Sequence, residues 1–523
     1  MFDVTTPSPQ ILNLDSYRDK VLGCWTGKNI GGTLGAPFEG RREMNAATFY
    51  VQDLRGAPAP NDDLDLQLVW LQAAEENGLY HLTPRLLGEY WMNFIVGPWN
   101  EYGVCKANIA NGLYPPLSGS CNNDIWKFSN GAWIRSEIWA CLFPGSPDEA
   151  AVFASLDACC DHCGEGIYAE VFTAALQSAA FVLSDIRQLI KVGLAKIPPD
   201  CRIARSVRLA CEQFDRGAEF AAARAAVVKD SEDLGWFQAP GNLGFVILGL
   251  LYGRGDFGTS ICLATNCGDD TDCTAATVGA LLGIISGRSG IPKKWIEPIG
   301  ESIKTVAINP FGLDVPGTLG DLTARVVKLA LAAQRENPTL PRLAAEPTAV
   351  TADYLEQITG HDAVAKRVWG QSPYALVFDL PYGRLAIDYE NGPGITAGVE
   401  KRLAVELMGM RFAEGVVQVA FKLPDGWRAL PGAAASINCI DGTAARWELA
   451  IIPGALADAF TYIPLELRLA GRFNPVTVQL PFQTAGSVNH NPYQHRGGFL
   501  DYADRKKRRL ARAMAANEGI TAP

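Results

Sequence analysis

The sequence predicts two domains of different classes, an all-α domain over residues 14–335 and an antiparallel β-sandwich over residues 351–485. The first part carries Ala- and Leu-rich segments of helical length, whereas apolar and polar residues alternate beyond about residue 374. A proline-rich segment separates the two patterns. A chain of 523 residues, 48% of them hydrophobic, is long enough to form two domains with large buried cores.

The helical prediction rests on residues 64–76, 170–183 and 275–285, which show too little alternation to be strands. Several of these segments are apolar on all sides, as is typical of helices inside a large core. Residues 97–130 differ, because they are rich in Gly, Pro, Asn and aromatic residues. We expect a long irregular loop there, with a functional role.

Three prolines, Pro338, Pro341 and Pro347, interrupt both helix and strand patterns and predict a linker over residues 336–350. The sandwich is predicted from period-two runs: Leu403, Val405 and Leu407; Val417, Val419, Phe421 and Leu423; Trp447, Leu449 and Ile451; Leu465, Leu467 and Leu469; Val476, Val478 and Leu480. Residues 486–523 are predicted as a C-terminal tail with a helix over 501–518. Its basic run, residues 505–509, is interpreted as a solvated face.

Composition excludes several classes of protein. Lys and Arg total 46 against 56 Asp and Glu, a net charge of -10, so a dedicated nucleic-acid binder is disfavoured and a small-molecule or oligosaccharide substrate is expected. Thirteen cysteines are too sparse for a disulfide scaffold, and their spacing matches no zinc finger. The N-terminus lacks the pattern of a signal peptide, and no apolar stretch reaches membrane length. We expect a cytoplasmic protein without a membrane partner, and a homo-oligomer remains open.

Two acidic clusters each precede an apolar helical segment. The first is Asn61-Asp62-Asp63-Leu64-Asp65, and the second is Cys267-Gly268-Asp269-Asp270-Thr271-Asp272-Cys273-Thr274. Taken alone, the first cluster is explained by helix capping, whereas capping explains only one or two of the three acids that the second cluster has within four residues. No cation lies close in sequence to either cluster. Carboxylate and amide oxygens in such a cluster suit Mg²⁺ or Mn²⁺, so we predict a shared cleft with two ions.

A third pattern lies near the N-terminus, where Gly23, Gly27 and Gly31 recur at every fourth residue. This spacing predicts close packing of a helix against a neighbour. The ladder runs into Gly35-Ala36-Pro37-Phe38-Glu39, a turn that ends the helix. Glu39 is therefore a candidate general acid or base at the mouth of a cleft.

Taken together and in this order, these motifs resemble the ADP-ribosylglycohydrolase family, which includes dinitrogenase-reductase-activating glycohydrolase and other enzymes that reverse protein ADP-ribosylation. The Glu39 turn, Asn61-Asp62-Asp63 and Asp270-Thr271-Asp272-Cys273 match three of its motifs. The segment from Asn130 to Arg135 resembles its substrate loop, and Asp161-His162 stands in place of a Thr-His pair. The resemblance covers roughly residues 17–333 and leaves the strand-rich domain unexplained.

The resemblance implies an orthogonal all-α helical fold with a binuclear metal centre that holds ribose hydroxyls. It implies Asn61, Asp62, Asp63, Asp270, Asp272 and Cys273 as metal ligands, and Glu39 and Asp63 as the catalytic carboxylates. Substrate contacts are expected from Asn130, Gly131, Arg135, His162, Trp99 and Tyr102. Cys273 stands where the family has a hydroxyl ligand, and a neutral thiol suits a hard cation poorly, so Thr274 or water is the alternative ligand. Asp269 stands where the family commonly has Gly, and Gly32 where many members have Asp.

Three hypotheses follow. The first is a metal-dependent glycoside hydrolase that cleaves an N- or O-glycosidic bond of a ribosyl-type or related sugar. The second is an ADP-ribosyl hydrolase acting on modified protein or a nucleotide. The third is a non-enzymatic descendant that binds carbohydrate or has a structural role, motivated by the altered positions Asn61 and Cys273.

Overall fold

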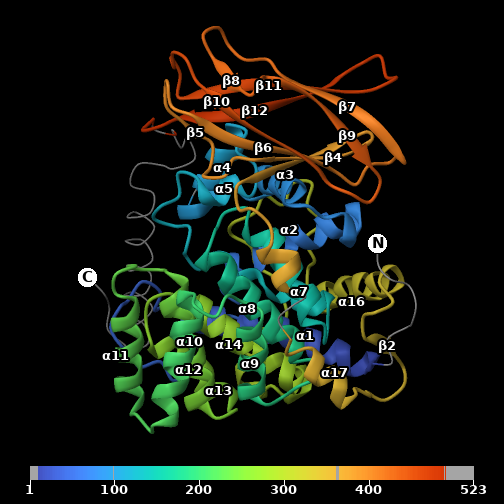
Figure 1. The fold of residues 1–523 in the computed structure, drawn as a ribbon. Helices are drawn as coiled ribbons and strands as arrows, with labels where there is room; N and C mark the ends of the chain where they lie inside the picture. The colour runs from blue at the N-terminus through green and yellow to red at the C-terminus, as the bar shows by residue number, and fades with distance from the viewer. Residues whose placement is uncertain (1–9, 98, 361–363, 488, 490–523) are drawn as a thin grey trace.

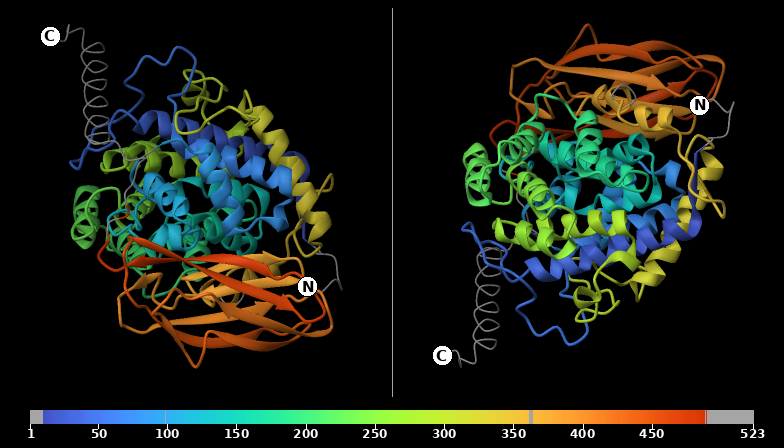
Figure 2. Two further views of the ribbon diagram at one scale, coloured as in Figure 1. Left: turned by 90° about the horizontal axis from the view of Figure 1, so that it is seen from above. Right: turned by 90° about the horizontal axis from the view of Figure 1, so that it is seen from below.

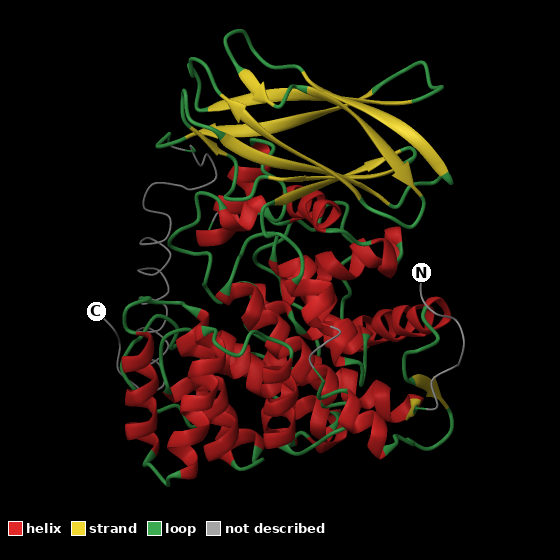
Figure 3. Ribbon diagram, viewed as in Figure 1, coloured by secondary structure: helices red, strands yellow, loops and turns green. Residues whose placement is uncertain are grey.

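The computed structural model describes residues 10–97, 99–360, 364–487 and 489, and it consists of a helical body with a two-sheet domain stacked on one end (Figure 1). The predicted order, an all-α domain followed by a β-sandwich, is confirmed. Figure 3 shows that helices and strands are almost completely segregated between the two parts. The predicted helix over 501–518 and the basic run 505–509 lie outside the described residues.

The helical body is built from α1 (Leu14–Gly35), α2 (Asp62–Asn77), α3 (Pro84–Phe94), α4 (Asn100–Ala110), α5 (Leu117–Ser120), α6 (Glu137–Leu142), α7 (Pro147–Ala158), α8 (Glu165–Ala179), α9 (Ile186–Ala195), α10 (Arg202–Asp215), α11 (Phe220–Ser231), α12 (Ala239–Gly253), α13 (Phe257–Asn266), α14 (Thr271–Ser286), α15 (Lys293–Ile296) and α16 (Leu319–Glu336). Helices α12 and α14 are buried along nearly their whole length, in keeping with their continuous apolar sequence. No helix in the described part of the chain has both the length and the apolarity needed to cross a membrane.

Helices α1 and α14 pack backbone against backbone at the centre of this body. A Cβ atom added to Gly27 would lie 1.9 Å from the carbonyl oxygen of Gly279, and one added to Gly31 would lie 2.0 Å from that of Ala275. The predicted close packing of the glycine ladder is therefore confirmed. It also brings the end of α1, which leads to Glu39, beside the start of α14.

The expectation of an irregular loop over residues 97–130 is wrong in part, because α4 and α5 lie within it. Gly103 and two Asn residues, Asn100 and Asn108, make the α4 sequence a poor helix by propensity. Tertiary burial overrides that propensity, since Tyr102, Cys105 and Ile109 all pack into the helical core.

The second domain has two five-stranded sheets within the described residues. One sheet has the order β3 (Ala375–Leu380), β4 (Gly383–Asp388), β6 (Lys401–Met408), β10 (Ala445–Ile452) and β8 (Arg428–Leu430). The other has β5 (Gly394–Ile395), β12 (Val476–Thr484), β11 (Phe460–Leu469), β7 (Glu414–Phe421) and β9 (Ala434–Ile440). Pairing is antiparallel except between β5 and β12, which are parallel. Each predicted period-two run falls in a strand, with Leu423 two residues beyond the end of β7.

Residues between the two domains pack on the helical body. Strand β2 (Arg342–Ala344) pairs with β1 (Ile11–Asn13) near the N-terminus. The helix α17 (Ala352–Gln357) contributes Tyr354, whose hydroxyl donates to the Gly145 carbonyl at 2.9 Å. After it, the π-helical turn η4 (Ala365–Trp369) is held by an ion pair between Arg367 and Glu149. The sandwich strands then begin at Ala375, and the exact domain boundaries predicted from the sequence stay predictions.

The sandwich rests on the segment that contains α4 and α5, as two further views also show (Figure 2). Leu113 and Leu117 of this segment are fully buried and belong to the sandwich core, not to the helical core. Nearby, the side-chain amides of Asn122 and Gln483 exchange hydrogen bonds of 3.0 and 2.9 Å. This segment therefore joins the helical body to the sandwich, through apolar packing and through side-chain hydrogen bonds.

Candidate active site

One pocket lies where the end of α1 and the starts of α2, α4 and α14 meet a loop around residue 130. It is lined by Glu39, Asp62, Trp99, Asn100, Glu101, Tyr102, Ser129, Asn130, Gly131, Ile134, Phe237, Asp270, Asp272 and Cys273. Nine of the sequence-predicted site residues are therefore on its wall. The others, Asn61, Asp63, Arg135 and His162, lie behind it.

The first acidic cluster forms the start of α2. Asn61 caps this helix, because its Oδ1 accepts a hydrogen bond of 2.8 Å from the Asp63 backbone N–H. Asp62 faces the pocket, and its Oδ2 accepts the Tyr102 hydroxyl at 3.0 Å. Asp63 points into the protein and is only 1% exposed. Burial, together with Asp272 and Asp62 nearby, raises the pKa of Asp63 well above its usual range, although Lys28 opposes this shift.

The second acidic cluster forms the start of α14. Asp270 Oδ2 accepts a hydrogen bond of 2.8 Å from the Asn130 side chain, and burial raises the pKa of Asp270 to about 7. Asp272 is also buried, and its Oδ1 has no hydrogen-bond partner among the described residues. Burial and then the neighbouring Asp270 raise the pKa of Asp272 well above its usual range. An unpartnered buried carboxylate oxygen is costly unless a cation or proton binds there.

The backbone conformation of Asp269 explains why a glycine is expected at this position. Its φ is +65°, a left-handed conformation that Gly adopts most easily and Asp tolerates. Its side chain turns away from the pocket, where Oδ1 accepts the Phe237 backbone N–H at 3.1 Å. Burial raises the pKa of Asp269 to about 6. The carboxylate thus fixes the loop before α12 and leaves Asp270 and Asp272 for the pocket.

The absence of cations near the acidic clusters holds along the sequence but not in space. Lys28, on α1, lies with its Nζ 3.7 Å from Asp63 Oδ2 and 3.1 Å from Glu137 Oε2. Burial alone would lower the pKa of Lys28, but the two carboxylates raise it overall. This one ammonium group is shared between Asp63 and Glu137. Asp62, Asp270 and Asp272 form no ion pair with any cation in the described part of the chain, so a surplus of negative charge remains at the pocket.

Cys273 occupies the position where a hydroxyl ligand was expected. Its Sγ donates a hydrogen bond of 3.4 Å to Asp63 Oδ1. Burial, followed by the surrounding aspartates, raises the pKa of the Cys273 thiol well above its usual range, so the group stays protonated. Thr274, the alternative ligand, is buried and donates its hydroxyl hydrogen bond to the Thr271 carbonyl at 3.3 Å. Water is therefore the remaining alternative at this position.

Three groups of side chains among the described residues have the spacing of a divalent-metal site; one is Glu101, Asp161 and His162, and the other two consist of predicted site residues. One ligand atom each from Glu39, Asp270 and Asp272 lie within 4.8 Å of one another, and so do atoms from Asp63, Asp272 and Cys273. Asp272 belongs to both of these sets, as expected for a residue between two ions. The donor set of the first group is entirely oxygen, which fits Mg²⁺ or Mn²⁺. The second group is expected to bind a divalent ion more weakly, because one of its ligands is a thiol and because Lys28 already pairs with Asp63.

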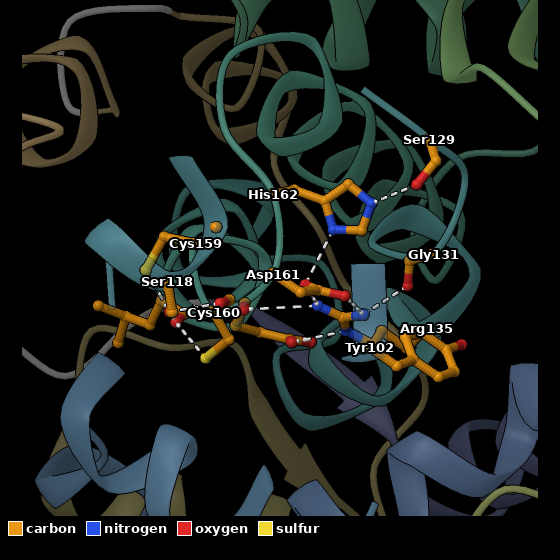
Figure 4. Close-up of polar contacts among 12 residues, drawn as sticks. Tyr102, Ser118, Ser129, Gly131, Arg135, Cys159, Cys160, Asp161 and His162 are labelled. Atoms are coloured by element: carbon orange, nitrogen blue, oxygen red, sulfur yellow. Dashed lines mark hydrogen bonds and ion pairs between the residues drawn. The ribbon is translucent and has the colours of Figure 1, made fainter. Parts of the chain in front are cut away.

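Arg135 and His162 lie behind the pocket, in a buried polar chain (Figure 4). The Arg135 guanidinium is 0% exposed and donates to Asp157 Oδ1 at 2.6 Å, to Asp161 Oδ1 at 2.6 Å and to the Gly131 carbonyl. Its donors are occupied, so it holds the loop containing Asn130 and Gly131 in place. The ring of His162 lies between Asp161 and Ser129.

Five residues of the pocket wall were not among the predicted site residues: Asn100, Glu101, Ser129, Ile134 and Phe237. Glu101 lies between Trp99 and Tyr102, which were predicted, and a lone acid in an aromatic stretch is its only signal in the sequence. Ser129 directly precedes the predicted Asn130. Phe237 comes from a distant segment, and nothing in its local sequence indicates the pocket.

The helical body places two acidic helix N-termini around one pocket, with carboxylates at the spacing of a divalent-metal site. The family model described as ADP-ribosylglycohydrolase matches residues 13–337, and the chain belongs to this family. Family membership supports a hydrolase.

Individual relatives are similar over short stretches. An ADP-ribosylarginine hydrolase Tri1 of Pseudomonas putida (strain GB-1) is 40% identical over 52 residues, 10% of this chain and 14% of that protein. An ADP-ribosylarginine hydrolase Tri1 of Serratia proteamaculans (strain 568) is 46% identical over 44 residues, 8% of this chain and 12% of that protein. A solved structure titled "ADP-ribosylglycohydrolase-related protein complex" has 22% identity and a TM-score of 0.41, covering 62% of this chain and 99% of that chain.

Proposed function

We propose that this protein is a metal-dependent glycoside hydrolase that cleaves an N- or O-glycosidic bond at a ribosyl-type sugar. One observation carries the proposal: the acidic starts of α2 and α14 meet at a single pocket, where Asp272 keeps a buried oxygen without a hydrogen-bond partner among the described residues. Carboxylates on this wall exceed the cations near it, and Mg²⁺ or Mn²⁺ would balance them.

Glu39, Asp62, Asp270 and Asp272 are the proposed metal ligands that reach the pocket. Cys273 is proposed to complete the site from the pocket wall and Asp63 from behind it, with Asn61 fixing the backbone of α2. Bound Mg²⁺ or Mn²⁺ would stabilise negative charge and orient the hydroxyl oxygens of the sugar.

The remaining wall residues suit a sugar ring. Trp99, Tyr102 and Phe237 provide aromatic surface that excludes water, and the Tyr102 hydroxyl is fixed on Asp62. The Asn130 amide is held on both sides, because its Oδ1 accepts Trp133 Nε1 at 3.1 Å and its Nδ2 donates to Asp270. Glu39 is proposed to accept the proton of the attacking water, since a carboxylate at this position can act as a general base.

Asp272→Asn tests the proposal directly. The substitution keeps the shape of the side chain but removes the charge that both candidate metal sets share. We expect Mn²⁺ affinity by calorimetry to fall at least about tenfold, and turnover at least about 100-fold, with an unchanged circular dichroism spectrum. Asp379→Asn, an exposed position on β3, is the matched control. Wild-type Mn²⁺ affinity in the Asp272 variant would contradict the proposed site.

ADP-ribose as the sugar group is the second candidate, favoured by the family and by the names of the two bacterial relatives. The test is release of free ADP-ribose from ADP-ribosylated arginine, serine and nucleotide. No release from any of them, together with hydrolysis of simpler ribosides, would remove this candidate. Failure to bind Mg²⁺ or Mn²⁺ at millimolar concentration would instead favour a non-enzymatic descendant.

A further inference from the structure

The third carboxylate of the first acidic cluster, Asp65, has no part in the metal site proposed above. Asp65 is fully buried on α2 and is not among the residues that line the pocket. Its Oδ2 instead accepts two backbone hydrogen bonds, from the N–H of Val306 at 2.6 Å and from that of Ala307 at 2.7 Å. Hydrogen bonds to a buried carboxylate are among the stronger ones in proteins. Asp65 therefore holds a segment that begins 241 residues further along the chain.

The segment held by Asp65 pairs with the chain that leads into the pocket wall. The Ala307 carbonyl accepts the backbone N–H of Val96 at 2.8 Å and that of Gly97 at 3.4 Å. Next to this contact, Ile95 and Ile308 form an antiparallel bridge. The two segments together make a short antiparallel ladder, which consists of residues 94–97 and 306–309.

The ladder ends against Trp99, an aromatic residue of the pocket wall. Gly97 and the Trp99 indole are in close contact, since a Cβ atom added to Gly97 would lie 2.8 Å from Cε3 of the indole. Trp99 in turn lies beside Tyr102, with ring centroids 6.1 Å apart, and the Tyr102 hydroxyl donates to Asp62 at 3.0 Å. A continuous series of contacts therefore runs from Asp65 through the ladder to the aromatic wall and returns to α2 at Asp62.

We propose that Asp65 is a positioning residue that fixes Trp99 in the pocket for sugar binding, a role that rests on the proposed glycoside hydrolysis. An indole held in one position offers a flat apolar face to the C–H side of a sugar ring. The indole takes no part in metal binding or in proton transfer, so it stabilises the bound substrate and the transition state equally. Loss of such a contact raises KM and leaves kcat nearly unchanged.

Asp65→Ala tests this role, because it removes the acceptor of both N–H groups. The substrates are para-nitrophenyl ribofuranoside, supplied as both anomers, and ADP-ribosylarginine. We expect KM to rise at least about tenfold on any of these that the wild-type protein hydrolyses, while kcat and Mn²⁺ affinity by calorimetry change less than about threefold. Asp65→Asn keeps an acceptor oxygen and should restore KM to within about threefold of the wild-type value. A loss confined to kcat, or no rescue by Asn, would overturn the role of Asp65.

Gln72→Ala is the matched control, because Gln72 lies on the same helix and holds the same loop further along. Its Oε1 accepts the N–H of Asp314 at 2.7 Å, and its Nε2 donates to the Gly312 carbonyl at 3.0 Å. These contacts lie beyond the ladder, so Gln72→Ala should destabilise the protein in urea unfolding and leave KM unchanged. An equal rise in KM in this variant would show that any loosening of the loop has the same effect, and would overturn the role of Asp65.

Gly97→Ala tests the last contact of the series and keeps Asp65. Its Cβ would displace the Trp99 indole, so we expect KM to rise at least about fivefold with kcat nearly unchanged. This variant decides if Asp65→Ala does not fold by circular dichroism, and an unchanged KM in it would overturn the inference. A wild-type protein that hydrolyses none of the substrates overturns the proposed function and this inference with it. An active wild-type protein with an unchanged KM in Asp65→Ala overturns the inference alone.

Discussion

Cys273 is the residue at which this chain departs most clearly from an oxygen-ligand site. Its protonated thiol donates to Asp63, and Asp63 in turn lies beside Lys28. Each of these contacts reduces the negative charge that the second candidate ion would meet. The same neighbourhood accounts for Gly32, because a Cβ there would lie 2.4 Å from the Asn61 side-chain nitrogen. An Asp at position 32 would require the Asn61 side chain to adopt another position.

Cys273→Ser is therefore expected to strengthen metal binding. A hydroxyl is a harder ligand than a thiol, so Mn²⁺ or Mg²⁺ affinity should rise about tenfold in calorimetry. Cys273→Ala is the matched control, because it removes the thiol without adding an oxygen. Equal affinities of the Ser and Ala variants would show that position 273 is not a ligand.

At the scale of the elements, the α1–α14 contact sets the geometry of the site. Four glycines of α1, Gly23, Gly27, Gly31 and Gly35, each face α14 backbone atoms or the residues just beyond its end at distances that leave no room for a Cβ. The register of this contact also brings the Thr271 hydroxyl to the Gly35 carbonyl at 2.8 Å. Packing of α1 against α14 thus brings Glu39 and Asp270 together.

Gly27→Ala tests this dependence. Its Cβ would meet Gly279 backbone atoms, which cannot move without shifting α14, so we expect a loss of about 3 kcal/mol in the free energy of unfolding. Gly320→Ala is the control, because this exposed residue of α16 has only the Thr318 hydroxyl within 4 Å, at 3.6 Å. That change should be neutral or slightly stabilising in urea unfolding. An equally small effect at Gly27 would contradict the close packing.

At the scale of the whole molecule, folding concentrates buried acids around one pocket. Asp270 and Glu101 have pKa values raised to about 7, and Asp269 to about 6, all mainly by burial. The sandwich supports the α4 side of the same pocket, since Leu113 and Leu117, which follow α4, are buried in its core. The C-terminal domain therefore stabilises the segment that carries Trp99, Glu101 and Tyr102.

The raised pKa values predict how stability depends on pH. Between about pH 4 and pH 7 the folded protein holds protons on these acids that the unfolded chain has lost, so they make the metal-free protein less stable as pH rises. We expect urea unfolding in the presence of EDTA to show this loss, and Mn²⁺ to reverse it at pH 7. Asp270→Asn should flatten the pH dependence. An unchanged slope in this variant would contradict the raised pKa of Asp270.

By itself the sequence determined the helical and strand-rich halves, the glycine contact of α1, and the acids at the starts of two helices, because these depend on local periodicity and capping. Only the tertiary structure decided that Lys28 reaches Asp63, that Arg135 is fully occupied behind the pocket, and that Glu101 and Phe237 line it. It also showed that α4 is a helix, despite its composition. These features depend on contacts between residues far apart in the chain, where burial and charge pairing outweigh local preference.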